Sequence, residues 1–179
     1  MASNPINTMD RFTSFSQEIQ AIEALRKSRR SKIKKYPTVS VLLSSLRADD
    51  LSNALDQLLA QTLATFDLVL GLHTIELSAS HKRQIAALNR RKVKVVVQNF
   101  TTDQTLGTIL STLATQSSGE YIAKMDDDDY YGPEHLRDLV DAAIDTGAEV
   151  VGRAMNYVYL EPLQLTVRRF APHGTQAVE

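Results

Sequence analysis

The chain has 179 residues, 43% of them hydrophobic and 23% charged, which is typical of one soluble globular domain with a substantial core. No apolar run approaches the roughly 20 residues that a membrane-spanning helix needs, and the N-terminus lacks the apolar segment of a signal peptide. The absence of cysteine excludes disulfides and thiolate metal sites and fits a reducing compartment, so we expect a cytoplasmic location.

The net charge of −1 hides an uneven distribution. Between positions 26 and 35 the chain has seven basic residues and no acidic one, namely Arg26, Lys27, Arg29, Arg30, Lys32, Lys34 and Lys35. The remainder carries 13 basic residues against 21 acidic ones. The segment from Arg26 to Lys35 is either a solvated helical extension or attracted to an anionic membrane surface, which would make the protein peripheral at the membrane. Nucleic acid is not expected as a partner, because only Tyr36 offers stacking nearby and the rest of the chain is acidic.

Residues 1–36 are expected to form a basic helical extension. The first 17 residues are polar and unpatterned, and a weakly amphipathic helix is predicted from 17 to about 35. From Pro37 onward, short apolar runs alternate with stretches of helical periodicity. The predicted strands are 39–43, 66–72, 93–97 and 120–125, and the predicted helices begin at Asp49 or Asp50, at Ser78 or Ser80, at about Thr105 and at Pro133.

Two of the predicted helices carry a clear apolar stripe. Apolar side chains recur at i, i+3, i+4, i+7 and i+8, at Leu51, Ala54, Leu55, Leu58 and Leu59 in one helix and at Leu136, Leu139, Val140, Ala143 and Ile144 in the other. The second of these helices is expected to end at Gly147. Further strands are predicted at 148–152, 157–160 and 165–169, the last two as a hairpin. The alternation predicts an α/β fold over residues 37–160, a mostly parallel sheet with helices on both faces, followed by a C-terminal strand and tail at 161–179.

Four consecutive carboxylates follow the predicted strand 120–125, from Asp126 to Asp129. Like charges in a row repel one another, so a divalent cation or a cluster of donors is the natural compensation. In an extended chain Asp126 and Asp128 point to one face and could share a hard cation through their oxygens. Ligands of parallel α/β sheets bind beyond the carboxyl ends of the strands, which is where these residues are expected. A solvated acidic turn is the alternative interpretation.

Several common sites are excluded by spacing. A calcium-binding EF-hand loop starting at Asp126 would need a glycine at its sixth position and a glutamate at its twelfth, where this chain has Tyr131 and Arg137. No Walker phosphate loop, G-x-G-x-x-G fingerprint, H-E-x-x-H motif or legible Ser-His-Asp arrangement is present. The histidines, His73, His81, His135 and His173, are scattered and are expected at the surface or in turns.

Four segments together resemble the GT-A fold of family 2 glycosyltransferases. They are P-T-V-S-V-L-L-S-S at 37–45, L-L-A-Q-T at 58–62, G-E-Y-I-A-K-M-D-D-D-D at 119–129 and G-P-E-H-L at 132–136. The resemblance implies a Rossmann-like domain that binds a nucleotide-diphosphate sugar, for transfer to an acceptor such as a cell-surface polysaccharide. In that family a D-x-D motif ends the fourth strand. By position, Asp126 and Asp127 would lie near the ribose and diphosphate, Asp128 with Asp126 would bind Mg or Mn, and Ser44 and Ser45 would lie against the nucleoside.

The sequence departs from the family pattern at two places. The aspartate that usually follows the second strand and grips the base is replaced by the run from Gly71 to Thr74, where either His73 substitutes for it or the segment is a plain loop. The acceptor-binding half, with the base that activates the acceptor hydroxyl, is not evident, and the catalytic residues therefore stay unassigned. Two alternatives follow: a nucleotide-binding remnant without turnover, and one half of a multi-chain or homo-oligomeric transferase paired through an open sheet edge.

Overall fold

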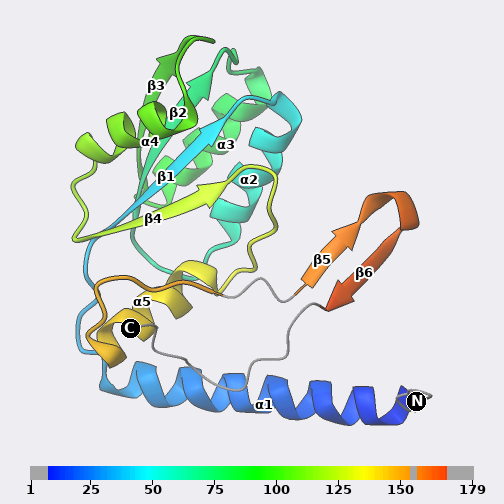
Figure 1. Ribbon diagram of the computed structural model, residues 1–179. Helices are drawn as coiled ribbons and strands as arrows, with labels where there is room; N and C mark the ends of the chain where they lie inside the picture. Colours follow the sequence, from blue (N-terminus) through cyan, green and yellow to red (C-terminus); the bar gives the residue numbers. More distant parts are fainter. Residues whose placement is uncertain (1–7, 154–156, 169–179) are drawn as a thin grey trace.

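The computed structural model describes residues 8–153 and 157–168 (Figure 1). Its elements in chain order are α1 (Thr8–Lys32), β1 (Val39–Ser45), α2 (Ala48–Ala60), β2 (Asp67–His73), α3 (Ala79–Arg90), β3 (Lys94–Phe100), α4 (Leu106–Thr115), β4 (Tyr121–Asp126), α5 (His135–Thr146), β5 (Tyr157–Leu160), the short 3-10 helix η1 (Glu161–Leu163) and β6 (Leu165–Arg168). The first four strands form a parallel sheet in the order β3-β2-β1-β4, and β5 and β6 form a separate antiparallel pair. The predicted α/β fold and the hairpin are confirmed.

Helices cover both faces of the sheet, as predicted. On one face, α2, α3 and α5 pack against the strands, and the stripe of α2 is buried at Leu51, Ala54, Leu55 and Leu58. On the other face, Ile109 and Leu113 of α4 pack against the central strands. Figure 1 shows α4 on the opposite side of β1 and β2 from α2 and α3. The central strands are therefore buried on both sides, which explains why they appear in the sequence as continuous apolar runs.

A close approach of the backbone fixes where β4 starts. Gly119 precedes the strand and donates its N–H to Ser40 Oγ at 2.9 Å. A Cβ atom at this glycine would lie 2.5 Å from the backbone nitrogen of Ser40 and 2.8 Å from the carbonyl oxygen of Tyr121. Only glycine fits there, and its small size lets β4 pair with β1 so that Asp126 lies level with Ser44.

The basic half of α1 lies along α5. Glu134, just before α5, and Asp138, Asp141 and Asp145 within it recur at helical spacing and form an acidic face. The ion pairs are Arg26 with Asp138 (2.6 Å), Arg29 with Asp145 (3.2 Å), Arg30 with Glu134 (2.6 Å), Asp138 (3.2 Å) and Asp141 (2.8 Å), and Lys32 with Asp145 (3.2 Å). The predicted attraction of this segment to a membrane stays a prediction, but four of its seven basic residues already have carboxylate partners.

Several predictions differ from the structure. Residues 148–153 form no strand, because no strand of the described chain pairs with the outer edge of β4, and Val150 is 90% exposed. His81 was expected at the surface or in a turn but is buried, and its ring contacts Ser78 N and Ala48 O as part of the N-terminal cap of α3. His173 lies outside the described residues. In the described ranges no helix is long and apolar enough to cross a bilayer. The domain boundaries at 36 and 160 stay predictions.

Candidate functional site

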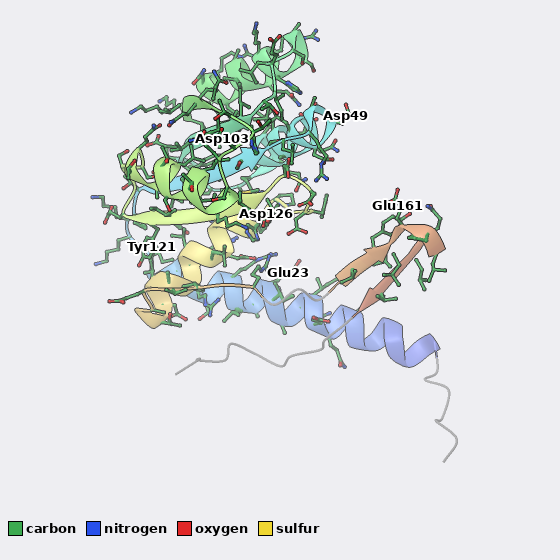
Figure 2. The ribbon with its side chains drawn as sticks, turned by 45° about the horizontal axis from the view of Figure 1, so that its top comes forward. Glu23, Asp49, Asp103, Tyr121, Asp126 and Glu161 are labelled. Carbon is green, nitrogen blue, oxygen red and sulfur yellow. The ribbon has the colours of Figure 1, made fainter. Side chains whose placement is uncertain are left out.

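The carboxylate segment begins where β4 ends, at the carboxyl edge of the sheet. Asp126 is the last residue of β4 and pairs with Ser44 of β1, while residues 127–129 form a bend (Figure 2). The extended geometry that would place Asp126 and Asp128 on one face therefore stops at Asp126. The reason is local, since the pairing that holds β4 extended ends at Ser44 and Asp126.

Three of the carboxylates have separate partners. The Lys124 ammonium lies 2.5 Å from both carboxylate oxygens of Asp126, one strand repeat away on the same face. Ser45, which is 2% exposed, directs its hydroxyl to Asp127 Oδ2 at 2.6 Å. The structure thus brings Ser45 and Asp127 together, and places Ser44 beside Asp126 in the strand register.

Arg47 neutralises the third carboxylate, Asp128. Arg47 directly precedes α2 and pairs with Asp50 in the first turn of that helix, and its Nη2 lies 3.2 Å from Asp128 Oδ2. The nearby charge of Asp50, and then the hydrogen bonds to Asp50 and Asp128, raise the pKa of Arg47 above its usual value. Both side chains of the Arg47–Asp128 pair are largely exposed, so the contact can exchange readily with a ligand.

Two glutamines, Gln57 within α2 and Gln61 directly after it, hold the segment that follows the carboxylates. Gln57 donates to the carbonyl oxygen of Asp129 and accepts from the N–H of Tyr131. Gln61, which is 1% exposed, donates to the carbonyl oxygen of Gly132 at 3.0 Å and accepts from the N–H of Leu136 at 3.0 Å. The amides therefore bond backbone groups on both sides of the turn between β4 and α5. The sequence analysis assigned no role to either residue. A glutamine next to the apolar stripe of a helix does, however, indicate that its amide forms buried hydrogen bonds.

Tyr131 and His135 form the wall beside the carboxylates. The N–H of Asp126 donates to the Tyr131 hydroxyl at 2.9 Å, and the Tyr131 and His135 rings pack edge to face with centroids 4.6 Å apart. Burial raises the pKa of Tyr131 above its usual value. Burial, with a smaller contribution from Arg153, lowers the pKa of His135 to about 4, so this imidazole is neutral near pH 7. Two uncharged polar groups thus border the charged cluster.

The carboxylate set has the oxygen chemistry that Mg or Mn prefers, but its side chains do not converge on one point. Within residues 8–153 and 157–168, no three acidic or histidine side chains are arranged to hold a metal ion. Asp126 and Asp128 instead carry protein cations, Lys124 and Arg47. A divalent cation bound by Asp126 and Asp128 would have to take the place of these ammonium and guanidinium groups.

His73 does not contact the predicted nucleoside side chains, Ser44 and Ser45. It ends β2, and its Nε2 is buried without a hydrogen-bond partner in the described part of the chain. A cavity of about 620 Å³ lies at the carboxyl ends of β2 and β3, with Leu72, Thr74 and Asn99 among its lining residues and His73 outside the lining. Whether His73 replaces the missing base-binding aspartate stays a prediction.

Comparison with known proteins gives one family. The family model described as "Glycosyl transferase family 2" matches residues 45–173. Among curated proteins, none matches the sequence.

The fold is shared with solved glycosyltransferase structures. Residues 1–349 of S. aureus TarS in complex with UDP-GlcNAc match with a TM-score of 0.50 at 20% identity, covering 66% of this chain and 37% of that one. The mannosyltransferase PcManGT from Pyrobaculum calidifontis, in complex with GDP-Man and Mn2+, matches with a TM-score of 0.49 at 18% identity, covering 68% and 38%. This chain therefore spans less than two fifths of the length of either protein. The expected GT-A fold is confirmed.

Proposed function

Because this chain belongs to glycosyl transferase family 2, we propose that it binds a nucleotide-diphosphate sugar at the carboxyl end of its parallel sheet, for transfer of the sugar to an acceptor. The observation that carries the proposal is the position of the carboxylates at the end of β4, next to the end of β1. Parallel α/β sheets bind their ligands at this edge. Ser44 and Ser45 would lie against the nucleoside, and Asp126 and Asp127 near the ribose and diphosphate.

We assign Asp128 and Asp126 as the ligands of Mg or Mn. Such a cation, when bound, stabilises the negative charge that develops on a leaving diphosphate. Arg47 pairs with Asp128 and Lys124 pairs with Asp126, so the negative charge of these carboxylates is compensated before a ligand binds. Arg47, which pairs with Asp128 in the absence of a cation, would leave this carboxylate to the metal, and its guanidinium could then contact a phosphate oxygen.

The test is titration calorimetry of the chain with UDP- and GDP-sugars, with and without Mn or Mg. We expect binding that requires the metal and that Asp128→Asn abolishes. The matched control is Asp103→Asn, which removes the same charge from the loop after β3, at the opposite edge of the sheet. Metal-independent binding, or an equal loss in both variants, would refute the metal assignment. Absence of binding to any nucleotide sugar would refute the proposal as a whole.

Nucleotide binding without transfer is a second candidate function. Inverting transfer needs a base within hydrogen-bond reach of the acceptor hydroxyl. In the described chain after Val150, the only acidic residue is Glu161, at the turn of the β5–β6 hairpin and apart from Asp126 (Figure 2). An assay of donor hydrolysis and transfer distinguishes the two candidates. Turnover above that of Asp128→Asn supports a transferase, and donor binding without turnover supports the second candidate.

A further inference from the structure

A second basic segment lies far from the carboxylates. Between Glu76 and Asp103 the sequence has no acidic residue and six basic ones, which are Lys82, Arg83, Arg90, Arg91, Lys92 and Lys94. The segment comprises α3, the turn after it and the start of β3.

Five of the six are exposed to solvent: Lys82, Arg83, Arg90, Lys92 and Lys94. We call these five residues the α3 basic surface. None of them forms an ion pair within the described parts of the chain. The sixth, Arg91, has a different task, because its guanidinium donates to the carbonyl oxygens of Leu59 and Gln61 and so ties α3 to the end of α2.

The helical repeat directs the central residues away from the protein. His81 and Leu88 are seven positions apart and are the buried residues of α3. Arg83 and Arg90 have the same spacing, two positions further on, which places them about 200° around the helix from the buried pair at 3.6 residues per turn. They therefore project on the solvent side. Lys92 follows in the turn, and its backbone has φ 65°.

Three acidic residues lie near the α3 basic surface. Asp56 of α2 accepts a hydrogen bond from Gln84 of α3 at 2.7 Å. Asp67 is level with Lys94 in the pairing of β2 with β3, and Glu76 lines the same cavity as Lys82. Asp56 and Gln84 lie on the side of α3 that faces α2. Arg83, Arg90 and Lys92 are exposed and form no ion pair in the described residues, so they carry the uncompensated positive charge of the surface.

The part of the α3 basic surface formed by Arg90, Lys92 and Lys94 and the carboxylates lie at opposite places on the sheet, whereas Lys82 lines the cavity at the carboxyl ends of β2 and β3. Lys94 is the first residue of β3, which is one edge strand, and Asp126 is the last residue of β4, which is the other edge strand. Because the strands are parallel, the amino end of β3 and the carboxyl end of β4 are diagonally opposed. A negatively charged partner on the α3 basic surface would leave the carboxyl end of the sheet open and keep the acidic cluster away from like charge.

We propose that the α3 basic surface docks this chain onto an anionic lipid surface. Clustered, exposed lysine and arginine side chains are attracted to the negative potential of acidic lipid. The side chains between them on α3, Ala86 and Ala87, are small and let the cations approach a flat surface. Nucleic acid fits less well, because the chain has no Phe, Tyr or Trp between Phe66 and Phe100 on which bases could stack.

The test is co-sedimentation of the whole chain with vesicles of phosphatidylcholine alone and of phosphatidylcholine with phosphatidylglycerol. We expect binding to the anionic vesicles only, weakened at about 0.5 M NaCl because salt screens exposed charges. The triple variant Arg83→Gln/Arg90→Gln/Lys92→Gln should bind about tenfold or more weakly, since each basic residue near the lipid adds to the attraction.

The matched control is Lys27→Gln/Lys34→Gln/Lys35→Gln. It removes the same charge from exposed positions of the first basic segment that have no ion pair in the described structure. An equal or larger loss in this control would overturn the assignment to α3. Absence of binding to anionic vesicles, or tighter binding to an oligonucleotide that the α3 variant abolishes, would overturn the lipid partner.

A second variant distinguishes loss of charge from a folding defect as the cause of weaker vesicle binding. Ala86→Glu adds a negative charge in the middle of the surface at an exposed position and removes no existing contact. Its circular dichroism melting curve should match that of the wild type, and its vesicle binding should fall. Unchanged vesicle binding in Ala86→Glu would also refute the proposal.

Discussion

At the scale of the residue, Lys124 and Asp126 are the pair on which the metal assignment can be tested most directly. They lie two positions apart on β4, on the face of the sheet that α4 covers at β1 and β2, and their side chains are 48% and 39% exposed. A metal ion on Asp126 must displace the ammonium group. Removing this competitor with Lys124→Gln should raise the affinity for Mn2+ by up to about fivefold, because exposed ion pairs are worth about 0–1 kcal/mol.

Calorimetric titration with MnCl2 measures this affinity. Lys27→Gln is the control, because it removes an equal charge from an exposed position far from β4 in the sequence. A lower or unchanged affinity in Lys124→Gln would show that Asp126 is not a metal ligand.

His135 gives a pH dependence with a definite sign. Burial, and then Arg153, lower its pKa from the usual 6.5 to about 4, while Asp138 acts in the opposite direction. Between pH 6.5 and 4 the unfolded chain binds a proton at this residue and the folded chain does not, so the free energy of unfolding falls as the pH falls through this window. Above pH 6.5 the contribution is fully present.

His135→Gln should remove part of this pH dependence. The effect should be at most about 2 kcal/mol, because the ring is only partly buried and solvent reduces the shift. Urea unfolding of both proteins at pH 7 and at about pH 4.5 measures it. Parallel losses of stability in the two proteins would contradict the buried, neutral state of His135.

At the scale of the element, α1 is attached to α5 mainly through charge. The strongest anchor is Asp141, which is 1% exposed and accepts hydrogen bonds from Arg30 Nε and the Tyr36 hydroxyl, both at 2.8 Å. Arg30→Gln leaves this buried carboxylate without its counter-ion, so the free energy of unfolding should fall by about 2–3 kcal/mol.

Lys32→Gln is the matched control for Arg30→Gln. Lys32 is 65% exposed in its pair with Asp145, and an exposed pair contributes little. Urea unfolding of the two variants should therefore give clearly different midpoints. Equal midpoints would mean that the ion pair between Arg30 and Asp141 contributes no more to stability than an exposed ion pair does.

The same two helices show what sequence patterns can reveal about elements. Apolar periodicity predicted α5 and its end at Gly147, which adopts the left-handed conformation with φ 69°. It also predicted a helix around the basic segment but could not pair it with α5. The information was present as two complementary stripes, basic residues at 26, 29 and 30 and acidic residues at 134, 138, 141 and 145. Which stripes meet depends on the path of the chain through the whole sheet, and local spacing does not encode that path.

The candidate site was predictable to about the same extent as these two helices. Apolar periodicity predicted that the four aspartates follow a strand, and the resemblance to family 2 glycosyltransferases predicted that they lie at the nucleotide-sugar site. The alternate-face argument for Asp126 and Asp128 assumed an extended chain, whereas strand pairing ends at Asp126. Ser45 and Arg47 come from the end of β1 and the residue before α2, so identifying them as partners required the register of β1 with β4. Lys124 lies two residues before Asp126 on the same strand face, so strand alternation alone places these two side chains together.

At the scale of the whole molecule, the open edge of the sheet predicts self-association. In the described structure no strand pairs with the outer edge of β4, where Ile122 is 51% exposed beside a cavity of about 410 Å³. Unpaired strand edges are templates for pairing with another chain. We expect the mass measured by light scattering to rise with protein concentration, and Ile122→Lys to suppress the rise, since a lysine on an edge strand opposes pairing.

Ile144→Lys is the control, because Ile144 is 38% exposed on α5 rather than on the sheet edge. A strictly monomeric wild type would exclude a homomeric assembly through β4. Equal suppression by both variants would place the contact elsewhere.

The two glutamines at the end of α2 have a consequence for the affinity of the carboxylates for a ligand. Gln57 and Gln61 bond backbone groups from Asp129 to Leu136, so the turn after the carboxylates is fixed by two side-chain amides from the last turn of α2 and the residue after it. The conformational entropy of this turn is lost when the chain folds, at roughly 1–2 kcal/mol for each residue fixed, and is not lost again when a ligand binds. Two residues that touch no ligand would thereby set how tightly the neighbouring carboxylates can hold one.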